Sequence, residues 1–383
     1  MTPFLVGPVF PYLAAGAVLL LGLFLLWRGK RGRGWGRRLG FGFGAVLALF
    51  GLALAAGAIA MSNAARALEA ARPAGGRFVA VGGERLFVKC EGPRGGPTLL
   101  LISGAYSSGW FLAPLHEALR ASHRSCLVDR PGTGWADPAQ SPRTVEAIIA
   151  ELMGAVTAAG ETGQIIPVGH SVGGLFAANL AQAYPDRVSA AVLLDPTPPS
   201  WFVEQQALYG CGPSSPGGLA FWASMFGLGL VPSLNPMNAD TPGSPNKALG
   251  AIYPTLVNLE SRPRSLAAQR EALANACRSG LSLVRSPGAL GDLPVLMIVQ
   301  DQPAAEIAKQ MPKDLTPREQ TNWKLLRAQW ERDYVGFTTR GTLVKAPAGS
   351  GHYFVLNEPA FTLGEIRKFL AATARPAAPP VNP

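Results

Sequence analysis

The sequence lacks the residue clusters that usually hold a metal ion or a phosphate group. Its 383 residues include only four histidines and four cysteines. The cysteines form no C-x-x-C pair of the kind that binds zinc. The sequence also has no glycine-rich dinucleotide fingerprint and no phosphate loop. We therefore expect no metal and no cofactor.

Two long stretches lack charge altogether. Phe4–Trp27 and Phe41–Met61 contain no Asp, Glu, Lys or Arg, and each reaches the roughly 20 apolar residues that cross a bilayer. A pair of buried core helices is one alternative. A signal peptide is another for the first stretch, but no basic residue precedes it and no small-residue cleavage pattern ends it. We predict a transmembrane hairpin over residues 1–62, with helices at about 4–27 and 41–61.

The formal net charge of +10 is concentrated between these two stretches. Six basic residues lie there: Arg28, Lys30, Arg31, Arg33, Arg37 and Arg38. Lys and Arg in short loops favour the cytoplasmic side of a membrane, so the loop 28–40 is predicted inside and the rest of the chain on the extracytoplasmic face. The basic excess thus indicates membrane orientation, and we expect no nucleic-acid partner.

After a connector at residues 63–76, short apolar runs alternate with helical patterns. Two runs around Gly82 and Gly83 predict a β-hairpin. Further strands are predicted at 98–103, 124–129, 164–169, 188–195, 293–300 and 341–346, and helices at 111–121, 144–159, 172–184, 317–333 and 359–372. Continuous apolar runs such as Thr98–Ser103 are typical of strands buried on both faces. The alternation predicts an α/β fold, with a mostly parallel sheet covered by helices on both faces.

This alternation stops between residues 197 and 292, which are rich in Pro, Gly and aromatic residues. We predict a cap, or lid, inserted between the two parts of the core at 77–196 and 293–373. The Pro-rich tail 374–383 is predicted to be disordered. Five aromatic residues of the cap are candidates for a substrate pocket or a membrane-facing surface, with the lid's own core as the alternative: Trp201, Phe202, Phe221, Trp222 and Phe226.

The motif Gly169-x-Ser171-x-Gly173 falls where a predicted strand meets a predicted helix. A nucleophile elbow needs that sharp turn, with small residues on both sides of the nucleophile so that the backbone can approach its neighbours. The N-terminal N–H groups of the following helix would face the developing oxyanion. Ser171 is therefore a candidate nucleophile.

The order of motifs resembles the α/β-hydrolase family over most of Arg77–Ala372. The resemblance is most specific at "GHSVGG", at "DRPGTGWADP" and at "GSGHYFVLNEP". The chain order of serine, acid and histidine is also the order of that family. The resemblance implies an α/β-hydrolase fold with an inserted cap and a serine hydrolase that forms an acyl-enzyme on an ester, with thioesters and amides left open.

A serine hydroxyl needs a base to remove its proton as it attacks. The resemblance implies that His352, in the loop after the last strand, is this base. Two acids could orient it. Asp195 ends the strand after the nucleophile helix, whereas Asp301 comes about two residues earlier than the acid of much of the family. We favour Asp195.

The resemblance also implies two backbone oxyanion donors, the N–H groups of Val172 and Ala105. Ala105 lies in a loop that reads Ser103-Gly104-Ala105, where family members commonly have His-Gly-x. A missing histidine does not remove a backbone donor. It does leave the geometry of this loop to be determined.

In the resembled fold the second strand runs antiparallel beside the fourth, which implies a disulfide between Cys90 and Cys126. Cys211 and Cys277 both lie in the inserted segment, where a bridge would staple the cap. Each cysteine could instead be a small buried apolar side chain. Disulfides would suit an oxidising, extracytoplasmic compartment.

The membrane hairpin favours a hydrophobic, lipid-like small-molecule ester as the substrate. Two other readings compete with an enzyme. One is a catalytically silent α/β-hydrolase fold that serves binding or scaffolding at the membrane. The other is a membrane assembly protein whose hairpin carries the function.

Overall fold

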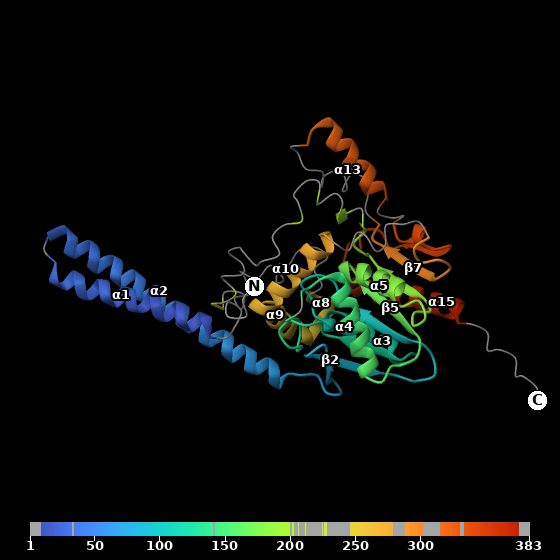
Figure 1. Cartoon of the computed structure of the whole chain (residues 1–383), viewed down its shortest axis with the longest axis horizontal. Coiled ribbons are helices and arrows are strands. Elements are labelled where there is room, and N and C mark those ends of the chain that lie inside the picture. Colours follow the sequence, from blue (N-terminus) through green and yellow to red (C-terminus); the bar gives the residue numbers. More distant parts are fainter. Residues whose placement is uncertain are drawn as a thin grey trace, which may run out of the picture.

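The computed structural model describes residues 9–32, 34–140, 142–199, 201–202, 206, 211, 224, 226–227, 246–278, 288–301, 315–329 and 333–374. These residues form two parts, which Figure 1 shows together. A long helical hairpin projects from one side of an α/β body, and the C-terminal helix lies on the opposite side of that body.

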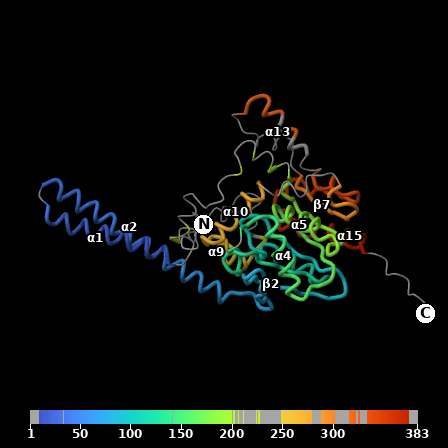
Figure 2. The backbone as a smooth tube through the Cα atoms, in the orientation of Figure 1, coloured from blue at the N-terminus to red at the C-terminus, as the bar shows by residue number. Residues whose placement is uncertain are grey.

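The hairpin consists of α1 (Phe10–Arg31) and α2 (Gly34–Ala70), which lie side by side along most of α1 (Figure 2). Both helices are long and apolar enough to cross a membrane. Only 11% and 22% of their apolar windows are buried within the protein, unlike a soluble core helix. The helices extend beyond the expected bounds: most of the basic loop is helical, and α2 continues through the first part of the connector. This continuation is rich in alanine, a strong helix former.

The body is built on one sheet whose strands have the order β1-β2-β4-β3-β5-β6-β7-β8. The strands are β1 (Arg77–Val81), β2 (Glu84–Glu91), β3 (Thr98–Ile102), β4 (Ser125–Val128), β5 (Ile165–His170), β6 (Ala191–Leu194), β7 (Pro294–Val299) and β8 (Arg340–Lys345). Strand β2 pairs antiparallel with β1 and β4, and all other neighbours are parallel. The predicted mostly parallel α/β sheet is confirmed.

Helices cover both faces of this sheet. They are η1 (Gly109–Leu112), α3 (Ala113–Leu119), α4 (Val145–Ala158), α5 (Val172–Ala183), η6 (Val335–Phe337), α14 (Phe354–Asn357) and α15 (Pro359–Thr373). A further helix, α13 (Pro317–Gln329), lies apart from the sheet (Figure 1). Side chains of α4 and α5 join one apolar cluster, whereas those of α3, α14 and α15 join another. Strands β3, β5, β6 and β7 are buried along their whole length between the clusters, which explains their continuous apolar sequence.

The described part of the predicted cap is helical near its end. It contains α8 (Asn246–Leu249), η5 (Gly250–Ile252), α9 (Tyr253–Glu260) and α10 (Pro263–Arg278). Helix α9 packs against α2, and α10 packs against α4. The cap therefore contacts both the hairpin and the body.

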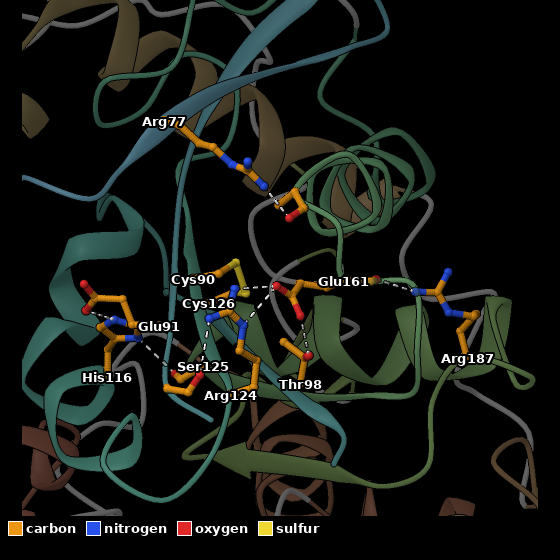
Figure 3. The surroundings of a disulfide bond; sticks show 12 residues. Arg77, Cys90, Glu91, Thr98, His116, Arg124, Ser125, Cys126, Glu161 and Arg187 are labelled. Atoms are coloured by element: carbon orange, nitrogen blue, oxygen red, sulfur yellow. Dashed lines mark hydrogen bonds and ion pairs between the residues drawn. A yellow bond between two sulfur atoms is a disulfide. The ribbon is translucent and has the colours of Figure 1, made fainter. Parts of the chain in front are cut away.

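Two disulfides join the four cysteines: one is the pair that the family resemblance implies, and the other is the bridge expected within the inserted segment. Cys90 and Cys126 are register partners on β2 and β4, and Cys211 is bonded to Cys277 of α10. Figure 3 shows the surroundings of the first bridge. Beside it, the buried Glu161 carboxylate accepts hydrogen bonds from Arg124 and from the Thr98 hydroxyl at 2.7 and 3.0 Å. The bridge thus joins β2 to β4, and the ion pair joins the residue before β4 to the segment before β5.

Replacing both Cys90 and Cys126 by alanine should lower the free energy of unfolding. The bridge spans 36 residues, and the loop-entropy model gives a loss of up to about 4 kcal/mol for a loop of this size. Chemical denaturation of the full chain in detergent, with and without reductant, measures this loss. If reductant destabilises the wild type no more than the double variant, the bridge contributes nothing to stability.

Candidate active site

Ser171 lies in the one-residue turn between β5 and α5. Its backbone has φ 57° and ψ −128°, a region that costs a non-glycine residue about 1 to 3 kcal/mol. Three hydrogen bonds hold it there. Its N–H donates to Leu194 O at 3.0 Å, and its carbonyl accepts from the N–H groups of Gly174 and Thr197, both at 2.9 Å. The predicted sharp turn is thus present and is fixed from both sides.

The two glycines of the motif are required by close backbone contacts. A Cβ at Gly173 would overlap the carbonyl oxygen of Ile102 at the end of β3. A Cβ at Gly169 would overlap the carbonyl oxygen of Gly173. Any side chain at either position would therefore push α5 away from the sheet and move Ser171.

Asp195 lies directly after β6 and faces His352. Its Oδ2 accepts from His352 Nδ1 at 2.5 Å. The Gln300 backbone N–H donates to Asp195 Oδ1 at 3.0 Å, and the Gln300 side-chain amide donates to Oδ2 at 2.9 Å. Asp195 also has a positive φ of 42°. Three donors therefore fix this carboxylate, and it in turn places the proton of His352 on Nδ1.

His352 lies in the loop between β8 and α14, after two glycines with positive φ, Gly349 and Gly351. Its side chain is 36% exposed, so one side of the ring is open to solvent or substrate. The buried His170 donates from Nε2 to the His352 carbonyl at 3.0 Å, and the two ring centroids are 4.7 Å apart. Burial, together with the nearby His352, lowers the pKa of His170 to about 3. His170 is therefore a neutral support for the His352 loop.

Asp301, the other candidate acid, lies elsewhere. It follows β7 at the surface, and its Oδ1 is 3.5 Å from the Nζ of Lys345. Both side chains of this pair are largely exposed, at 40% and 51%. An exposed pair of this kind contributes little to stability. Of the two acids, the structure thus brings only Asp195 to His352.

The two predicted oxyanion donors belong to segments that lie next to Ser171. Val172 is the first residue of α5, so its N–H has no acceptor within the helix. Ala105 follows Gly104, and a Cβ at Gly104 would lie 2.9 Å from Ser171 Cβ. The loop after β3 therefore runs directly beside the Ser171 side chain, without the histidine that is common in the resembled family.

Arg130 holds this loop in place, and sequence reasoning did not assign it a role. The side chain is 5% exposed. Its Nη1 donates to Ser103 O at 2.8 Å, and its Nη2 donates to Gly104 O and Ser107 O at 2.9 and 3.3 Å. Burial lowers its pKa to about 10, so the guanidinium remains charged at neutral pH. Its place directly after Asp129 in the quoted motif was the one available signal.

Asp129 explains why the motif "DRPGTGWADP" has a second glycine, Gly134. Its buried carboxylate accepts from the backbone N–H groups of Gly109 and Trp135 at 3.0 and 2.9 Å. A Cβ at Gly134 would overlap this carboxylate. The chain thus wraps around Asp129 and directs the next residue, Arg130, toward the loop after β3. Burial raises the pKa of Asp129 to about 6.

Two residues of the cap complete the support of the same loop. Glu260, at the end of α9, accepts from the Ser108 N–H at 2.9 Å, and Gln269 of α10 donates to Ser107 O at 3.3 Å. Burial raises the pKa of Glu260 to about 8, so its carboxyl group is mostly protonated at neutral pH. The cap therefore contacts the loop after β3 through polar groups that are themselves buried.

The aromatic cap candidates have different environments. Phe202 is 1% exposed and belongs to the main apolar core, with Trp201 packed edge-on at 5.0 Å. Phe202 is therefore core rather than pocket lining. Phe226 is partly exposed and lies beside α2. Phe221 and Trp222 lie outside the described residues.

Two groups of side chains in the described ranges are close enough to share a metal ion: Cys90, Cys126 and Glu161, and Glu91, His116 and Glu117. The cysteines of the first group are joined in a disulfide and offer no thiolate. In the second group, Lys89 and Arg120 already pair with the carboxylates at 3.3 and 2.6 Å. Neither donor set suits a metal ion.

Comparisons with known proteins agree with this fold. Residues 97–227 match the family model of the alpha/beta hydrolase fold. A pimeloyl-[acyl-carrier protein] methyl ester esterase of Xylella fastidiosa is 38% identical over 27% of this chain and 38% of its own length. A lipase of Mycobacterium tuberculosis is 34% identical over 29% of this chain and 41% of its own. The chain thus spans about two fifths of the length of these curated relatives.

Solved structures resemble the chain over a longer range. A thermophilic esterase from Thermogutta terrifontis has a TM-score of 0.53 at 20% identity and covers 78% of this chain and 98% of its own. The epoxide hydrolase CorEH has a TM-score of 0.57 at 17% identity, with the same coverage. At this identity the likeness concerns the fold alone. The chain has the α/β-hydrolase fold, and its local sequence similarity is to esterases and lipases.

Replacing Arg130 by methionine should lower kcat more than it raises KM, because the loop that carries the Ala105 N–H loses its support. A misplacement of about 1 Å costs up to about 100-fold in rate, so we expect a loss of about 10- to 100-fold in ester hydrolysis. Arg130→Lys keeps the charge but reaches fewer carbonyl groups, so its kcat should lie between those of the wild type and Arg130→Met. Steady-state kinetics on a soluble ester measure both constants.

The control is Arg85→Met, which removes an exposed ion pair with Asp137 within the same motif. This variant should keep kcat within about twofold, as expected for a surface pair. A raised KM with unchanged kcat in Arg130→Met would contradict a role in positioning the loop.

Proposed function

We propose that this chain is a membrane-anchored serine hydrolase that cleaves a carboxylic ester. The observation that carries the proposal is the contact between Asp195 and His352 beside the strained turn at Ser171. A carboxylate, an imidazole and a serine in this order serve acyl transfer in α/β-hydrolases. The local similarity to an esterase and a lipase supports the same chemistry.

The mechanism follows from the protonation of His352. Because Asp195 accepts the Nδ1 proton, Nε2 of the neutral ring is free to act as a base. It removes the proton of Ser171 Oγ as this oxygen attacks the ester carbonyl, and later donates that proton to the departing alcohol. Water then attacks the acyl-enzyme while His352 takes a proton from it. The bond between the acyl carbon and Ser171 Oγ breaks, the acid leaves, and His352 returns the proton to Ser171 Oγ. Asp195 stabilises the imidazolium that forms in each step.

The carbonyl oxygen becomes an oxyanion during both attacks. The Val172 and Ala105 N–H groups would donate to it, with the dipole of α5 adding a partial positive charge. Removing one such donor typically costs about 100- to 1,000-fold in rate. The buried Arg130 would act indirectly, by fixing the carbonyl groups of the loop that carries Ala105.

Serine at the elbow distinguishes this chain from hydrolases that use a carboxylate there. Solved structures of the same fold include epoxide hydrolases, but the acid of this site, Asp195, lies after β6 and faces the histidine. The attacking atom would be a hydroxyl oxygen, which forms an ester with an acyl group. Esters are therefore the favoured substrate class, and thioesters and amides follow the same chemistry.

The hairpin would anchor the enzyme, with its basic turn inside the cell. The charge distribution supports this orientation, because Arg and Lys cluster where α1 ends and α2 begins. The two disulfides support an extracytoplasmic hydrolase domain, because such bonds persist in oxidising compartments. A hydrophobic ester is the substrate most accessible to an enzyme held in this place.

The full chain in detergent micelles should react with a fluorophosphonate probe at Ser171, because the activated hydroxyl attacks the phosphorus as it would a carbonyl. Mass spectrometry of the peptides locates the adduct. Ser171→Ala should abolish labelling, and the matched control Ser189→Ala should leave it intact. A folded wild-type protein without an adduct would favour the alternative of a silent hydrolase fold used for binding.

Exchanging the acids one at a time tests the assignment of Asp195. Asp195→Asn should lower kcat by about 1,000- to 10,000-fold, because the amide stabilises the wrong histidine tautomer. Asp301→Asn should stay within about twofold, because it loses only an exposed pair with Lys345. Steady-state hydrolysis of a soluble ester gives kcat for both variants. The reverse order of effects would transfer the role to Asp301.

A further inference from the structure

Part of the cap touches the hairpin through a backbone contact that only glycine permits. A Cβ at Gly57 of α2 would overlap the carbonyl oxygen of Phe226. On the other side of the contact, Gly227 has φ 77°, and its Cβ would lie 2.9 Å from Gly57 O. Phe226 and Gly227 lie in a turn, here called the cap turn, and the Gly227 N–H donates to Ser224 O at 3.2 Å. Two glycines thus let the cap turn press directly against the helix.

The contact lies at a defined height along the hairpin. The Tyr12 hydroxyl is hydrogen-bonded to Ala58 O at 3.2 Å and to Ser62 Oγ at 2.5 Å, beside the contact. Tyrosine with an apolar ring and a polar tip is typical of the membrane–water interface. At the other end of α1, the exposed Trp27 ring stacks with Arg31. The 22 residues of α1 span about 33 Å at 1.5 Å per residue, close to the thickness of about 30 Å of the hydrocarbon core.

Gly57 lies inside the apolar stretch that ends at Met61. With a rise of 1.5 Å per residue, Gly57 is about 6 Å below that end. If a bilayer covers this stretch, the Phe226 carbonyl beside Gly57 would lie at the boundary between headgroups and hydrocarbon. The sequence around this turn, Leu219–Pro232, contains no charged residue, so the sequence favours this apolar environment.

The position of the hydrolase body along the hairpin is fixed, because the C-terminal part of α2 packs against that body. Leu68 of α2 is 3% exposed and packs into the core. The Leu68 carbonyl accepts from the indole N–H of Trp135 at 2.8 Å. Helix α9 of the cap packs against α2 as well. Figure 1 shows the consequence: α9 and α10 lie at the root of the hairpin, on the side of the body that would face the bilayer.

We propose that the cap turn at Phe226 and Gly227 is inserted into the extracytoplasmic leaflet beside Gly57, so that the site receives an ester that is dissolved in the bilayer. The substrate class is an ester whose acyl chain keeps it in the membrane. This inference rests on the proposed hydrolase function for its substrate, but not for its depth. The two parts are therefore tested separately.

Depth is measured with the full chain in phosphatidylcholine vesicles. All four native cysteines are in disulfides, so Phe226→Cys introduces a unique thiol for an environment-sensitive fluorophore. The matched control carries the same fluorophore on Lys368→Cys. Lipids with a spin label near the headgroup should quench the fluorophore at position 226 at least about twice as strongly as the fluorophore at position 368, because quenching requires contact with the leaflet. Lys368 is exposed on α15, on the side of the body away from the hairpin (Figure 1). Equal quenching at the two positions overturns the inserted turn.

Access of substrate from the bilayer is measured by comparing two single variants of α2, one at Gly57 and one at Gly42. Gly57→Leu should push the cap turn off the helix, whereas Gly42→Leu has open space around its Cβ and serves as the control. We expect Gly57→Leu to lose about tenfold in kcat/KM on a long-chain p-nitrophenyl ester embedded in vesicles, with soluble p-nitrophenyl acetate unchanged. Gly42→Leu should leave both rates unchanged.

An equal effect of Gly57→Leu on the two esters, or no effect on either, overturns access from the bilayer. A wild-type protein that hydrolyses neither ester and takes no fluorophosphonate instead overturns the proposed hydrolase function. The fluorophore measurement needs no activity, so it still decides the depth of the turn in that case.

Discussion

At the carboxyl end of β5, three backbone segments lie so close together that side chains are excluded from several positions. Gly173 lies against the carbonyl of Ile102, Gly169 lies against Gly173, and Gly104 lies against Ser171. The close approach bends the chain into the strained turn at Ser171 and brings the loop after β3 beside it. The geometry of the serine and of both backbone donors therefore depends on packing between glycines, which tolerates little variation.

The buried charge of Arg130 holds the loop after β3 in place. The loop after β3 turns its carbonyl groups inward, where water cannot reach them, and buried carbonyls without a donor are costly. Arg130 supplies several donors from one rigid plane. Glu260 and Gln269 of the cap then satisfy the end of the same loop. The described part of the cap therefore helps to hold the loop in which we propose an oxyanion donor.

The sequence predicts those features that depend on local pattern. The buried strands are continuous apolar runs, so their presence follows from the sequence pattern. Ser171 was identified because a strand precedes it and a helix follows. The choice between Asp195 and Asp301 was harder, because it depends on which strand end faces the last loop. The Gln300 contacts that fix Asp195 join residues 105 positions apart, and no local pattern predicts them.

Arg130 was missed for a related reason. Arginine is mostly exposed in proteins, and only the fold reveals that this one points into a shell of carbonyl groups. The expected boundaries of the hairpin were also too short, because hydropathy marks apolar residues rather than the end of a helix. The alanine-rich residues 62–70 continue α2 through helix propensity and through the packing of Leu68 against the body.

This continuation determines how the hydrolase domain is held relative to the hairpin. A flexible connector over residues 63–76 would have a root-mean-square span of about 20 Å and would let the domain rotate freely. A helix that runs from the apolar stretch to Leu68 and bonds to Trp135 fixes both height and orientation. In the membrane orientation proposed above, a docked helix presents one side of the cap to the lipid at all times. An ester confined to a leaflet meets the same entrance in every encounter, whereas on a flexible tether most orientations of the domain would face away from it.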